Sequence, residues 1–433
     1  MSTAGSGADR GETERRDSPE EAEFRRRARG WLEEHLAPKR PAGEEQVDTT
    51  RVNPVPMTPR PRPSAEEELA TTKAYQSALF DAGLAGLTWP TEYGGQGLPN
   101  RFQEIFNEES ATFEVPATVL TIGLGMCGPT ILEWGSDEIK RRYVPPMLRA
   151  DEIWCQLFSE PGAGSDVASL QMRAVRDGDE YVLTGQKVWT SGAHYCDYGV
   201  VIARTDPDQP KHRGITMFIV DMHAPGVTIR PLVQITGGSN FNEVFFDGVR
   251  IHESHRLGPE NEGWRAAVAM LANERVAIGS GGGGGRGTGI RPYLEAARRR
   301  GVDRDPVVRQ QLADLYIRQR VLSFIGQRTR SAVKAGQAPG PEGSIGKLYG
   351  ALLARQAADL GAAIAGASAT AWDDELTDSR WAMAVVAAPG GAIAGGTNEV
   401  QRNIIGERVL GLPKEPQVDR DIPFREVKVS AGS

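Results

Sequence analysis

The part of the chain that decides its fold reads YVLTGQKVWTSGAHYCDYGVVIA over residues 181–203. Short runs of β-branched and aromatic residues alternate there with glycine, serine and aspartate. Several runs of this kind, separated by turn residues at short intervals, are typical of an antiparallel sandwich or barrel. The same alternation of β-prone runs and turn residues extends on both sides. It predicts these strand segments: Ile153–Phe158, Tyr181–Thr184, Lys187–Thr190, Gly199–Ala203, Thr216–Val220, Val227–Val233 and Glu243–Val249.

Helical patterns flank this β-rich stretch. Apolar residues recur at helical spacing over Pro19–Ala37 and again from Ala65, and the helical period returns at Asn261 and lasts to about Leu410. The order helical, β, helical predicts an α+β multidomain chain. The expected boundaries are a disordered tail over 1–18, an N-terminal helical domain over 19–151, a central β domain over 152–260, a C-terminal helical domain over 261–415 and a tail over 416–433.

Composition excludes several classes of function. Of the 433 residues, 25% are charged and 39% hydrophobic, and the net charge of −7 argues against a nucleic-acid-binding face. No apolar run approaches the roughly 18 residues that span a bilayer. Three cysteines, at positions that match no metal site or disulfide framework, indicate a reducing compartment. The N-terminus is acidic and has no apolar signal region, so a cytoplasmic location is expected.

Three clusters of glycine and hydroxyl residues suggest chemistry. SEPGAGSD, over 159–166, follows a strand, and its glycines allow the backbone to approach a ligand closely. GQKVWTSGA, over 185–193, offers a tryptophan face to a planar ring and two hydroxyls to its polar edge. GGTNEVQR, over 395–402, opens a helix whose N–H groups suit an anion or a developing oxyanion. Each cluster also has an ordinary structural interpretation. The first could be a β-turn, the second a strand with a core tryptophan, and the third a helix N-cap.

Taken in order, and with NEVFFDGVRI at 242–251, these motifs resemble the acyl-CoA dehydrogenase family. The likeness runs from Phe24 to Pro413. It implies an N-terminal helical domain, a central antiparallel β-barrel-like domain and a C-terminal four-helix bundle, with FAD as the cofactor. Carried over position by position, it implies FAD contacts from Gln156, Phe158, Ser159, Ser165, Trp189, Thr190, Ser191, Thr397 and Glu399.

The resemblance further implies that the Cα–Cβ bond of an acyl-CoA is oxidised to the trans-2-enoyl-CoA. Many members place the catalytic base as a glutamate at the position of Gly395, and glycine cannot take a proton. Isovaleryl and long-chain members carry it on a helix of the bundle, beside an arginine, and the matching residues are Glu274 and Arg275. The expected roles are α-proton to Glu274 and β-hydride to flavin N5. The residues expected at the substrate are Arg275, Ser165, Gly395 and Gly396.

The resemblance also implies an electron-transfer flavoprotein as acceptor and a homo-oligomer, either dimer or tetramer. The segments through which members reach a neighbouring subunit's FAD are degenerate here, at Arg298–Arg300 and Gly361–Ser368. Two alternatives stay open: a relative that acts on a carrier-protein thioester or uses oxygen, and a non-catalytic partner subunit of a hetero-oligomeric dehydrogenase. The flavin motifs and Glu274 count against the second. The sequence does not identify the acyl group.

Overall fold

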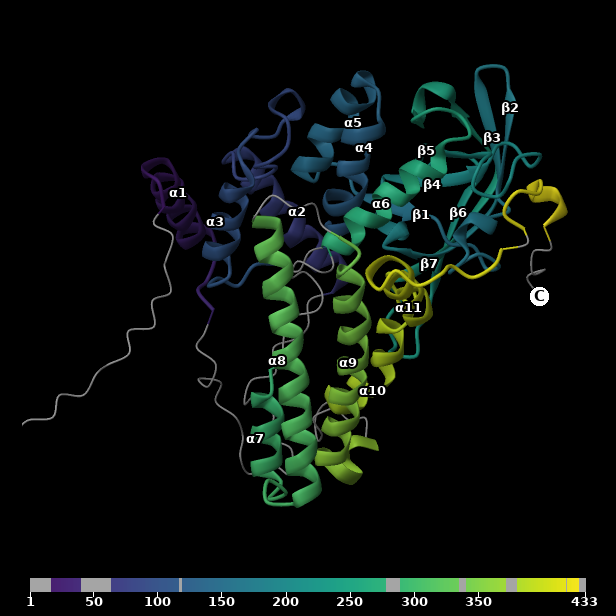
Figure 1. The fold of residues 1–433 in the computed structure, drawn as a ribbon. Helices are drawn as coiled ribbons and strands as arrows, with labels where there is room; N and C mark the ends of the chain where they lie inside the picture. The colour runs from purple at the N-terminus through teal and green to yellow at the C-terminus, as the bar shows by residue number, and fades with distance from the viewer. Residues whose placement is uncertain are drawn as a thin grey trace, which may run out of the picture.

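The computed structural model describes residues 17–39, 64–116, 119–277, 289–334, 340–370, 380–417 and 419–427. The chain forms N-terminal helices, a central sheet and C-terminal helices, in that order (Figure 1). The N-terminal helices and the sheet lie side by side, and the long helices α8 and α9 extend away from them. The predicted α+β fold class is confirmed.

The N-terminal part consists of helices that are started by serine caps. Ser18 and Ser64 each accept a hydrogen bond from a backbone N–H three residues on, where Glu21 and Glu67 reach back to complete capping boxes. Ser18 and its neighbour Asp17, which the expected tail includes, are therefore ordered. The helices are α1 (Pro19–His35), α2 (Ala65–Asp81), α3 (Asn100–Ser110), α4 (Gly128–Trp134) and α5 (Asp137–Arg149).

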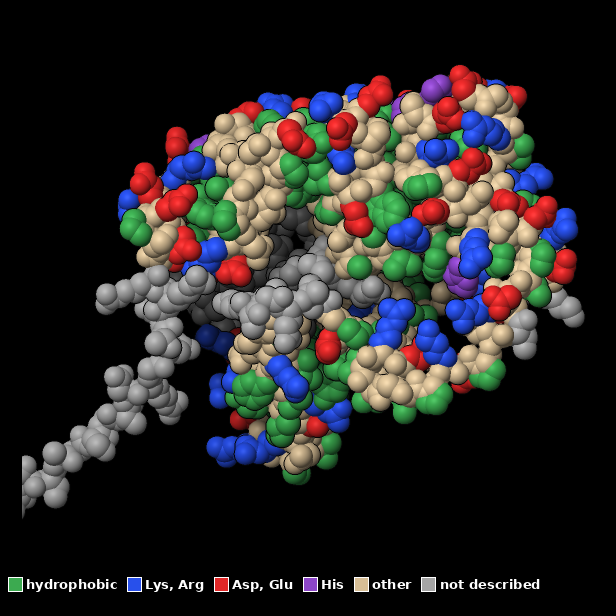
Figure 2. All heavy atoms as spheres, turned by 45° about the horizontal axis from the view of Figure 1, so that its top comes forward, with side chains coloured by type: hydrophobic (Ala, Val, Ile, Leu, Met, Phe, Trp, Pro, Cys, Tyr) green, Lys and Arg blue, Asp and Glu red, His purple; other side chains and the backbone are tan. Residues whose placement is uncertain are grey.

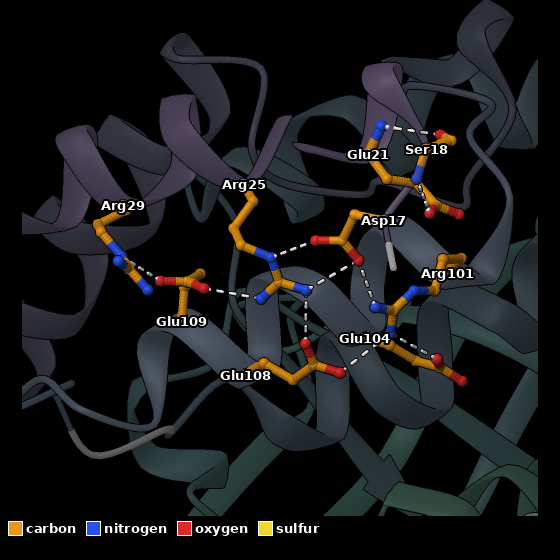
Figure 3. A network of polar contacts seen from close by, with 9 residues as sticks. All are labelled: Asp17, Ser18, Glu21, Arg25, Arg29, Arg101, Glu104, Glu108 and Glu109. Carbon is orange, nitrogen blue, oxygen red and sulfur yellow. Dashed lines mark hydrogen bonds and ion pairs between the residues drawn. The ribbon is translucent and has the colours of Figure 1, made fainter. Parts of the chain in front are cut away.

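A network of ion pairs joins α1 to α3 (Figure 3). Arg25 contacts Asp17 at 2.6 Å, Glu109 at 2.7 Å and Glu108 at 2.8 Å. Arg101 approaches Asp17 from the other side at 2.9 Å. The hydrogen bond from Arg25, with a smaller contribution from Arg101, lowers the pKa of Asp17 to about 2 against the opposing effect of burial. Asp17 thus fixes the start of α1 as a charged group.

The central part is an eight-stranded sheet in the order β6-β7-β3-β2-β4-β5-β8, with β1 paired to β4. It is antiparallel except for the parallel pairs β1–β4 and β2–β4. Its strands are β1 (Trp154–Leu157), β2 (Arg173–Asp177), β3 (Glu180–Ser191), β4 (Tyr198–Arg204), β5 (Ile215–Asp221), β6 (Val227–Leu232), β7 (Phe241–His252) and β8 (Arg256–Leu257).

Two strand predictions need correction. The segments Tyr181–Thr184 and Lys187–Thr190 are one strand, β3, which stays paired with β7 through two register shifts. Strand β2 was not predicted, because its sequence RAVRD is mostly charged and only Ala174 is buried. Hydrogen bonds to β3, not burial of an apolar face, define β2.

The C-terminal part contains α6 (Gly263–Ala277), α7 (Arg291–Arg299), α8 (Pro306–Lys334), α9 (Gly343–Ala365), α10 (Arg380–Gly391) and α11 (Asn398–Ile404). A core that includes Tyr293, Leu315, Leu360 and Trp381 joins α7 to α10. A side chain at Gly361 would come within 2.1 Å of Trp381, so glycine lets the indole pack there. No helix in the described ranges has the length and apolarity to cross a membrane.

Helix α6 belongs to a different core. Ala266, Ala267 and Met270 are fully buried and pack with side chains of α4, α5 and the sheet, among them Ile131, Trp154 and Met217. One continuous apolar cluster therefore spans all three parts of the chain. Because α6 is fixed by this cluster over its first two turns, its last turn is held in a set position relative to the sheet.

We expect Asp17→Asn to destabilise α1 at neutral pH but not at low pH. A carboxylate whose folded pKa is depressed stabilises the protein above its unfolded pKa of about 4, and this contribution is lost as the pH falls toward about 2. The measurement of this contribution is hydrogen exchange of the α1 amides in wild type and variant, at matched pH values from 7 down to 2. Exposed Glu34→Gln on the same helix is the control. A difference in protection that persists unchanged at the lowest pH would contradict the expectation.

Candidate active site

A buried ion pair holds the first two sequence clusters together. The Nζ of Lys187 lies 2.8 Å from Oε1 of Glu160 and donates to the carbonyl of Phe158 at 3.1 Å. Lys187 is fully buried and Glu160 is 8% exposed. Burial lowers the pKa of Lys187, and the neighbouring Glu160 opposes that shift. The pair fixes the loop after β1 against strand β3.

Glu160 also orders the chain beyond this loop. Its two carboxylate oxygens accept backbone hydrogen bonds from Gln171 at 2.6 Å and Met172 at 3.0 Å, just before β2. The carbonyl of Ser159 accepts from the N–H of Val188 at 2.9 Å. The expected cofactor residues Phe158 and Ser159 are therefore aligned along β3. Gln156 lies in β1, and Ser165 is exposed on the loop.

The second cluster projects a tryptophan from a bulge in β3. The register between β3 and β7 shifts between Lys187 and Thr190, and Trp189 takes a left-handed backbone with φ of 60°. A bulky residue with a left-handed backbone is a conformational outlier. Such strained residues are found preferentially at ligand-binding and active sites. The indole is 60% exposed and is contacted edge-on by Phe241, with ring centroids 5.9 Å apart. The alternative of a core tryptophan therefore does not apply to Trp189, because its side chain is exposed on the surface of the sheet.

Next to it, Thr190 carries a buried hydroxyl with an open hydrogen-bonding position. Thr190 is 2% exposed, and its Oγ1 has no partner among the described residues. A buried polar group without a partner costs about 1–3 kcal/mol, so native proteins seldom leave one. An exposed aromatic face beside an unpaired hydroxyl fits a planar ligand with a polar edge. The neighbouring Ser191, expected to bind the same edge, ends β3 and is partly exposed.

Asn242, which the sequence did not single out, fixes this bulge. It is fully buried on β7, and its Nδ2 donates to the carbonyl of Thr190 at 3.0 Å. Its Oδ1 lies 3.1 Å from Nδ1 of His194, which follows the second cluster. The only hint in the sequence was a polar residue among apolar ones in the NEVFFDGVRI segment. Asn242 thereby supports the backbone that presents Trp189.

The third cluster forms the start of α11. Thr397 caps the helix by accepting from the N–H of Val400 at 3.2 Å, and Gly395 and Gly396 have φ of 65° and 85°. Residues with side chains rarely adopt that backbone, which suits glycine at 395 and disfavours a carboxylate there. Gln401 donates from Nε2 to the carbonyls of Gly395 and Gly396. Glu399 is exposed and pairs with Arg402 at 3.1 Å.

The expected base lies at the end of α6. The backbone of Glu274 and Arg275 is helical, in the last turn of α6, while their side chains lie outside the described part of the structure. The structure thus brings the first two clusters into one site. It places the third cluster on α11, which packs on α9.

The segments expected to reach a neighbouring subunit lie close together within this chain. Arg300, after α7, donates a hydrogen bond to Oγ of Ser368, after α9. Ser368 also donates to the carbonyl of Ala365 at 2.7 Å. The two degenerate segments therefore form one end of the C-terminal helices.

Three family models match the chain. They are described as acyl-CoA dehydrogenase, N-terminal domain, over residues 56–151; acyl-CoA dehydrogenase, middle domain, over residues 155–249; and acyl-CoA dehydrogenase, C-terminal domain, over residues 261–410. Their order agrees with the helical, β, helical order of the structure.

Individual relatives match more than nine tenths of the chain. The acyl-CoA dehydrogenase IpdE1 of Mycobacterium tuberculosis (strain ATCC 25618 / H37Rv) is 37% identical over 394 residues, covering 91% of this chain and 98% of the relative. The crystal structure of the ChsE4–ChsE5 complex from Mycobacterium tuberculosis matches with TM-score 0.69 and 31% identity over 93% of this chain and 100% of that one. The Tcur3481–Tcur3483 steroid ACAD matches with TM-score 0.71 and 29% identity over 92% and 99%.

The chain therefore belongs to the acyl-CoA dehydrogenase family. It is an oxidoreductase of a flavoprotein family whose members use FAD in lipid metabolism. The uncovered indole of Trp189 and the unpaired hydroxyl of Thr190 fit that cofactor's flat ring and polar edge.

We expect Thr190→Val to change stability and cofactor affinity in opposite directions. Removing a buried hydroxyl that has no partner should stabilise the cofactor-free protein by about 1 kcal/mol, while a lost hydrogen bond should weaken FAD binding by roughly tenfold. Thermal unfolding of the apoprotein and quenching of flavin fluorescence measure the two effects. Exposed Thr184→Val on the same strand should change neither. Equal FAD affinity in Thr190→Val and wild type would remove the hydroxyl from the site.

Asn242→Ala should weaken FAD binding without removing any group that contacts the cofactor. The carbonyl of Thr190 loses its donor, so the bulge is no longer held and Trp189 is no longer positioned. We expect a loss of about 1–3 kcal/mol in the free energy of unfolding and at least a tenfold rise in the Kd for FAD. The control is Asn240→Ala, whose side chain is exposed. A variant that is destabilised but binds FAD normally would show that Asn242 supports only the sheet.

Proposed function

We propose that this protein is an FAD-dependent acyl-CoA dehydrogenase that converts an acyl-CoA thioester to the trans-2-enoyl-CoA. The observation that carries the proposal is the juxtaposition in one site of Trp189, exposed from a left-handed bulge, and the unpaired hydroxyl of Thr190. Membership of the family supplies the reaction class, and both features fit the cofactor of that reaction. When bound, FAD accepts the β-hydrogen of the substrate as hydride at N5.

Glu274 is the proposed base for the α-proton. Gly395 cannot serve, because it has no ionisable group and its left-handed backbone disfavours a side chain. Glu274 lies on α6, the helix that is buried against both the N-terminal helices and the sheet. A base held by a rigid element keeps the distance to the reacting carbon constant. Arg275, the next residue, is the proposed cation near the thioester.

The remaining proposed contacts are those that the resemblance to the family implies, and the joining of the first two clusters by the Lys187–Glu160 pair supports them. Gln156, Phe158, Ser159, Trp189, Thr190 and Ser191 form the FAD side of the site, with Thr397 and Glu399 from α11. Ser165 stands at the exposed end of the first loop, toward the CoA part of the substrate. The N–H groups of Gly395 and Gly396, ahead of α11, are suited to polarise a thioester carbonyl as enolate character develops.

Self-association is part of the proposal. Helix α8 carries Tyr316, Ile317, Val321 and Phe324 at helical spacing, and these side chains are 44–57% exposed. An apolar stripe of this kind on a helix is the mark of a surface that another helix covers. We propose a second copy of the chain, in a dimer or tetramer, as that cover. The proposed electron acceptor is an electron-transfer flavoprotein.

A bulky acyl group is the proposed substrate class. One solved relative is named a steroid ACAD, at 29% identity over nearly the whole chain. A panel of acyl-CoAs should therefore include ring-containing thioesters beside linear and branched ones. Anaerobic bleaching of the flavin by one of them identifies the acyl group.

Glu274→Gln should keep FAD and lose the reaction. The amide cannot accept the α-proton, so we expect flavin reduction by the best acyl-CoA of the panel to slow by at least about 10³-fold. α-Proton exchange with deuterated water should be lost as well. Stopped-flow absorbance of the flavin and mass spectrometry of the substrate measure these effects.

The matched control is Glu262→Gln, at the other end of α6, where the carboxylate forms an exposed pair with Arg265 at 2.8 Å. It should reduce its flavin at the wild-type rate. Retained turnover in Glu274→Gln would remove Glu274 from the role of base. A wild-type protein that is purified without flavin and does not take it up would instead indicate a non-catalytic partner subunit, of the kind that a hetero-oligomeric complex contains.

A further inference from the structure

Near its C-terminus the chain forms a strap, residues 419–427, that lies against the loop joining β4 to β5 (Figure 1). The backbone N–H groups of Phe424 and Arg425 donate to carbonyls of that loop at 2.9 and 3.1 Å. The side chain of Arg425 also pairs with Asp208 of the loop at 2.8 Å. The match to the C-terminal family model ends at residue 410, so the strap lies outside it. This part of the chain, expected as a tail, is therefore attached to the β domain.

The strap covers a buried cation, Arg204, at the end of β4. Arg204 is 3% exposed, and its guanidinium carbon lies 3.7 Å from the ring centroid of Phe424. Burial lowers the pKa of Arg204 to about 10, against the attraction of Glu160, so the side chain remains a cation at pH 7. Among the residues that the structure describes, its hydrogen-bond partners are carbonyls and none is an acid. A buried cation without an acid partner is costly, so the aromatic face of Phe424 stabilises it.

The carbonyls that Arg204 contacts belong to two different segments. On one side, Arg204 donates to the carbonyl of Lys211 at 2.8 Å, in the β4–β5 loop. On the other side, it donates to the carbonyls of Ala168 at 2.7 Å and Leu170 at 3.4 Å. These two residues belong to the short 3₁₀ turn η3 (Val167–Ser169) and its C-cap, which continue the SEPGAGSD loop. The position of that turn therefore depends on the guanidinium that the strap covers.

Lys211 makes a second, ionic connection between the strap and the loop. Its Nζ lies 3.0 Å from Asp419 in the strap and 3.0 Å from Asp166 in the SEPGAGSD loop. Asp166 also accepts a hydrogen bond from Oγ of Ser169 at 2.6 Å. On the right-hand side of Figure 2, where the strap lies, both acidic and basic side chains occur on the surface. The residue before Asp166 is Ser165, so this contact supports the backbone that carries it.

The ends and the middle of the segment 159–172 have different supports. Glu160 fixes both ends, by its ion pair with β3 and by two backbone hydrogen bonds just before β2. The middle, residues 165–170, which we call the Ser165 segment, is joined to the β domain through Arg204 and Lys211. Loosening the strap should therefore affect the Ser165 segment and leave the ends of the loop in place.

We propose that Phe424 and Lys211 are positioning residues for the Ser165 segment, and that the strap thereby sets the affinity of the site for its thioester substrate. The inference rests on the proposed function, in which Ser165 faces the substrate. Phe424 acts through Arg204, and Lys211 acts through Asp166. Because the reacting atoms lie elsewhere, the strap acts on KM and leaves kcat unchanged. The proposed FAD contacts lie on β3 and at the start of the loop, so FAD affinity is unchanged as well.

The test is Phe424→Leu in the full-length, FAD-loaded protein. Leucine keeps an apolar side chain but has no ring face to place over the guanidinium of Arg204. Hydrogen exchange of the Ser165 segment should become roughly five- to thirty-fold faster, as expected for the loss of a desolvated cation–ring contact. The KM for the best acyl-CoA of the panel should rise by at least about twofold, because only the ordered segment binds substrate. The values of kcat and of the Kd for FAD should match those of the wild type.

Three further variants separate the contacts. Phe424→Tyr keeps the ring, so exchange of the Ser165 segment and KM should stay at their wild-type values. Asp419→Asn weakens the ionic contact of Lys211, so exchange should become about two- to five-fold faster at low salt, and the difference should shrink at high salt. Glu426→Gln, at an exposed position of the strap, is the matched control and should change neither exchange nor KM.

Three outcomes would overturn the inference. The first is unchanged exchange of the Ser165 segment in Phe424→Leu. The second is faster exchange with an unchanged KM, which would make the strap a structural support alone. The third is a Phe424→Tyr variant as impaired as Phe424→Leu, which would remove the ring contact with Arg204 from the role. Failure of the proposed function gives a different result: the Ser165 segment would still exchange faster in Phe424→Leu, while no acyl-CoA of the panel would bleach the flavin of the wild type.

Discussion

The candidate site depends on one buried ion pair, between Lys187 of β3 and Glu160 of the loop after β1. Lys187 is taken wholly out of water, and among the described residues Glu160 and the carbonyl of Phe158 compensate for the lost hydration of its ammonium group. Breaking such a pair by removing one partner costs about 3–5 kcal/mol, since the other charge stays buried. The pair also sets the course of the chain. Glu160 fixes the backbone that enters β2, and Lys187 stands directly before the bulge that carries Trp189.

The helix that carries the proposed base, Glu274, is fixed by apolar packing. Helix α6 inserts Ala266, Ala267 and Met270 into the core that joins α4, α5 and the sheet. Small residues at two of these positions let the helix approach its neighbours closely. Its first turns are thereby locked, and the last turn, where Glu274 lies, follows from helical geometry alone. The sheet and α6 are thus two rigid elements that share one core.

The sequence predicted the elements that local chemistry determines. Ser18 and Ser64 begin helices because their side chains cap them, and the β-branched runs form strands because they are buried. Strand β2 was not predicted, because hydrogen bonds to β3 define it and burial of an apolar face does not. At the site, the clusters around Ser159, Trp189 and Thr397 were found from their glycines and hydroxyls. Asn242 and Lys211 were missed because each acts on residues distant in sequence: Asn242 on Thr190, and Lys211 on Asp166 and Asp419.

In the cofactor-free protein, the indole of Trp189 is exposed to water and is contacted edge-on by Phe241, so it lies outside the interior of the sheet. FAD bound over this indole, as proposed, would cover it, so cofactor binding and the burial of apolar surface would be coupled.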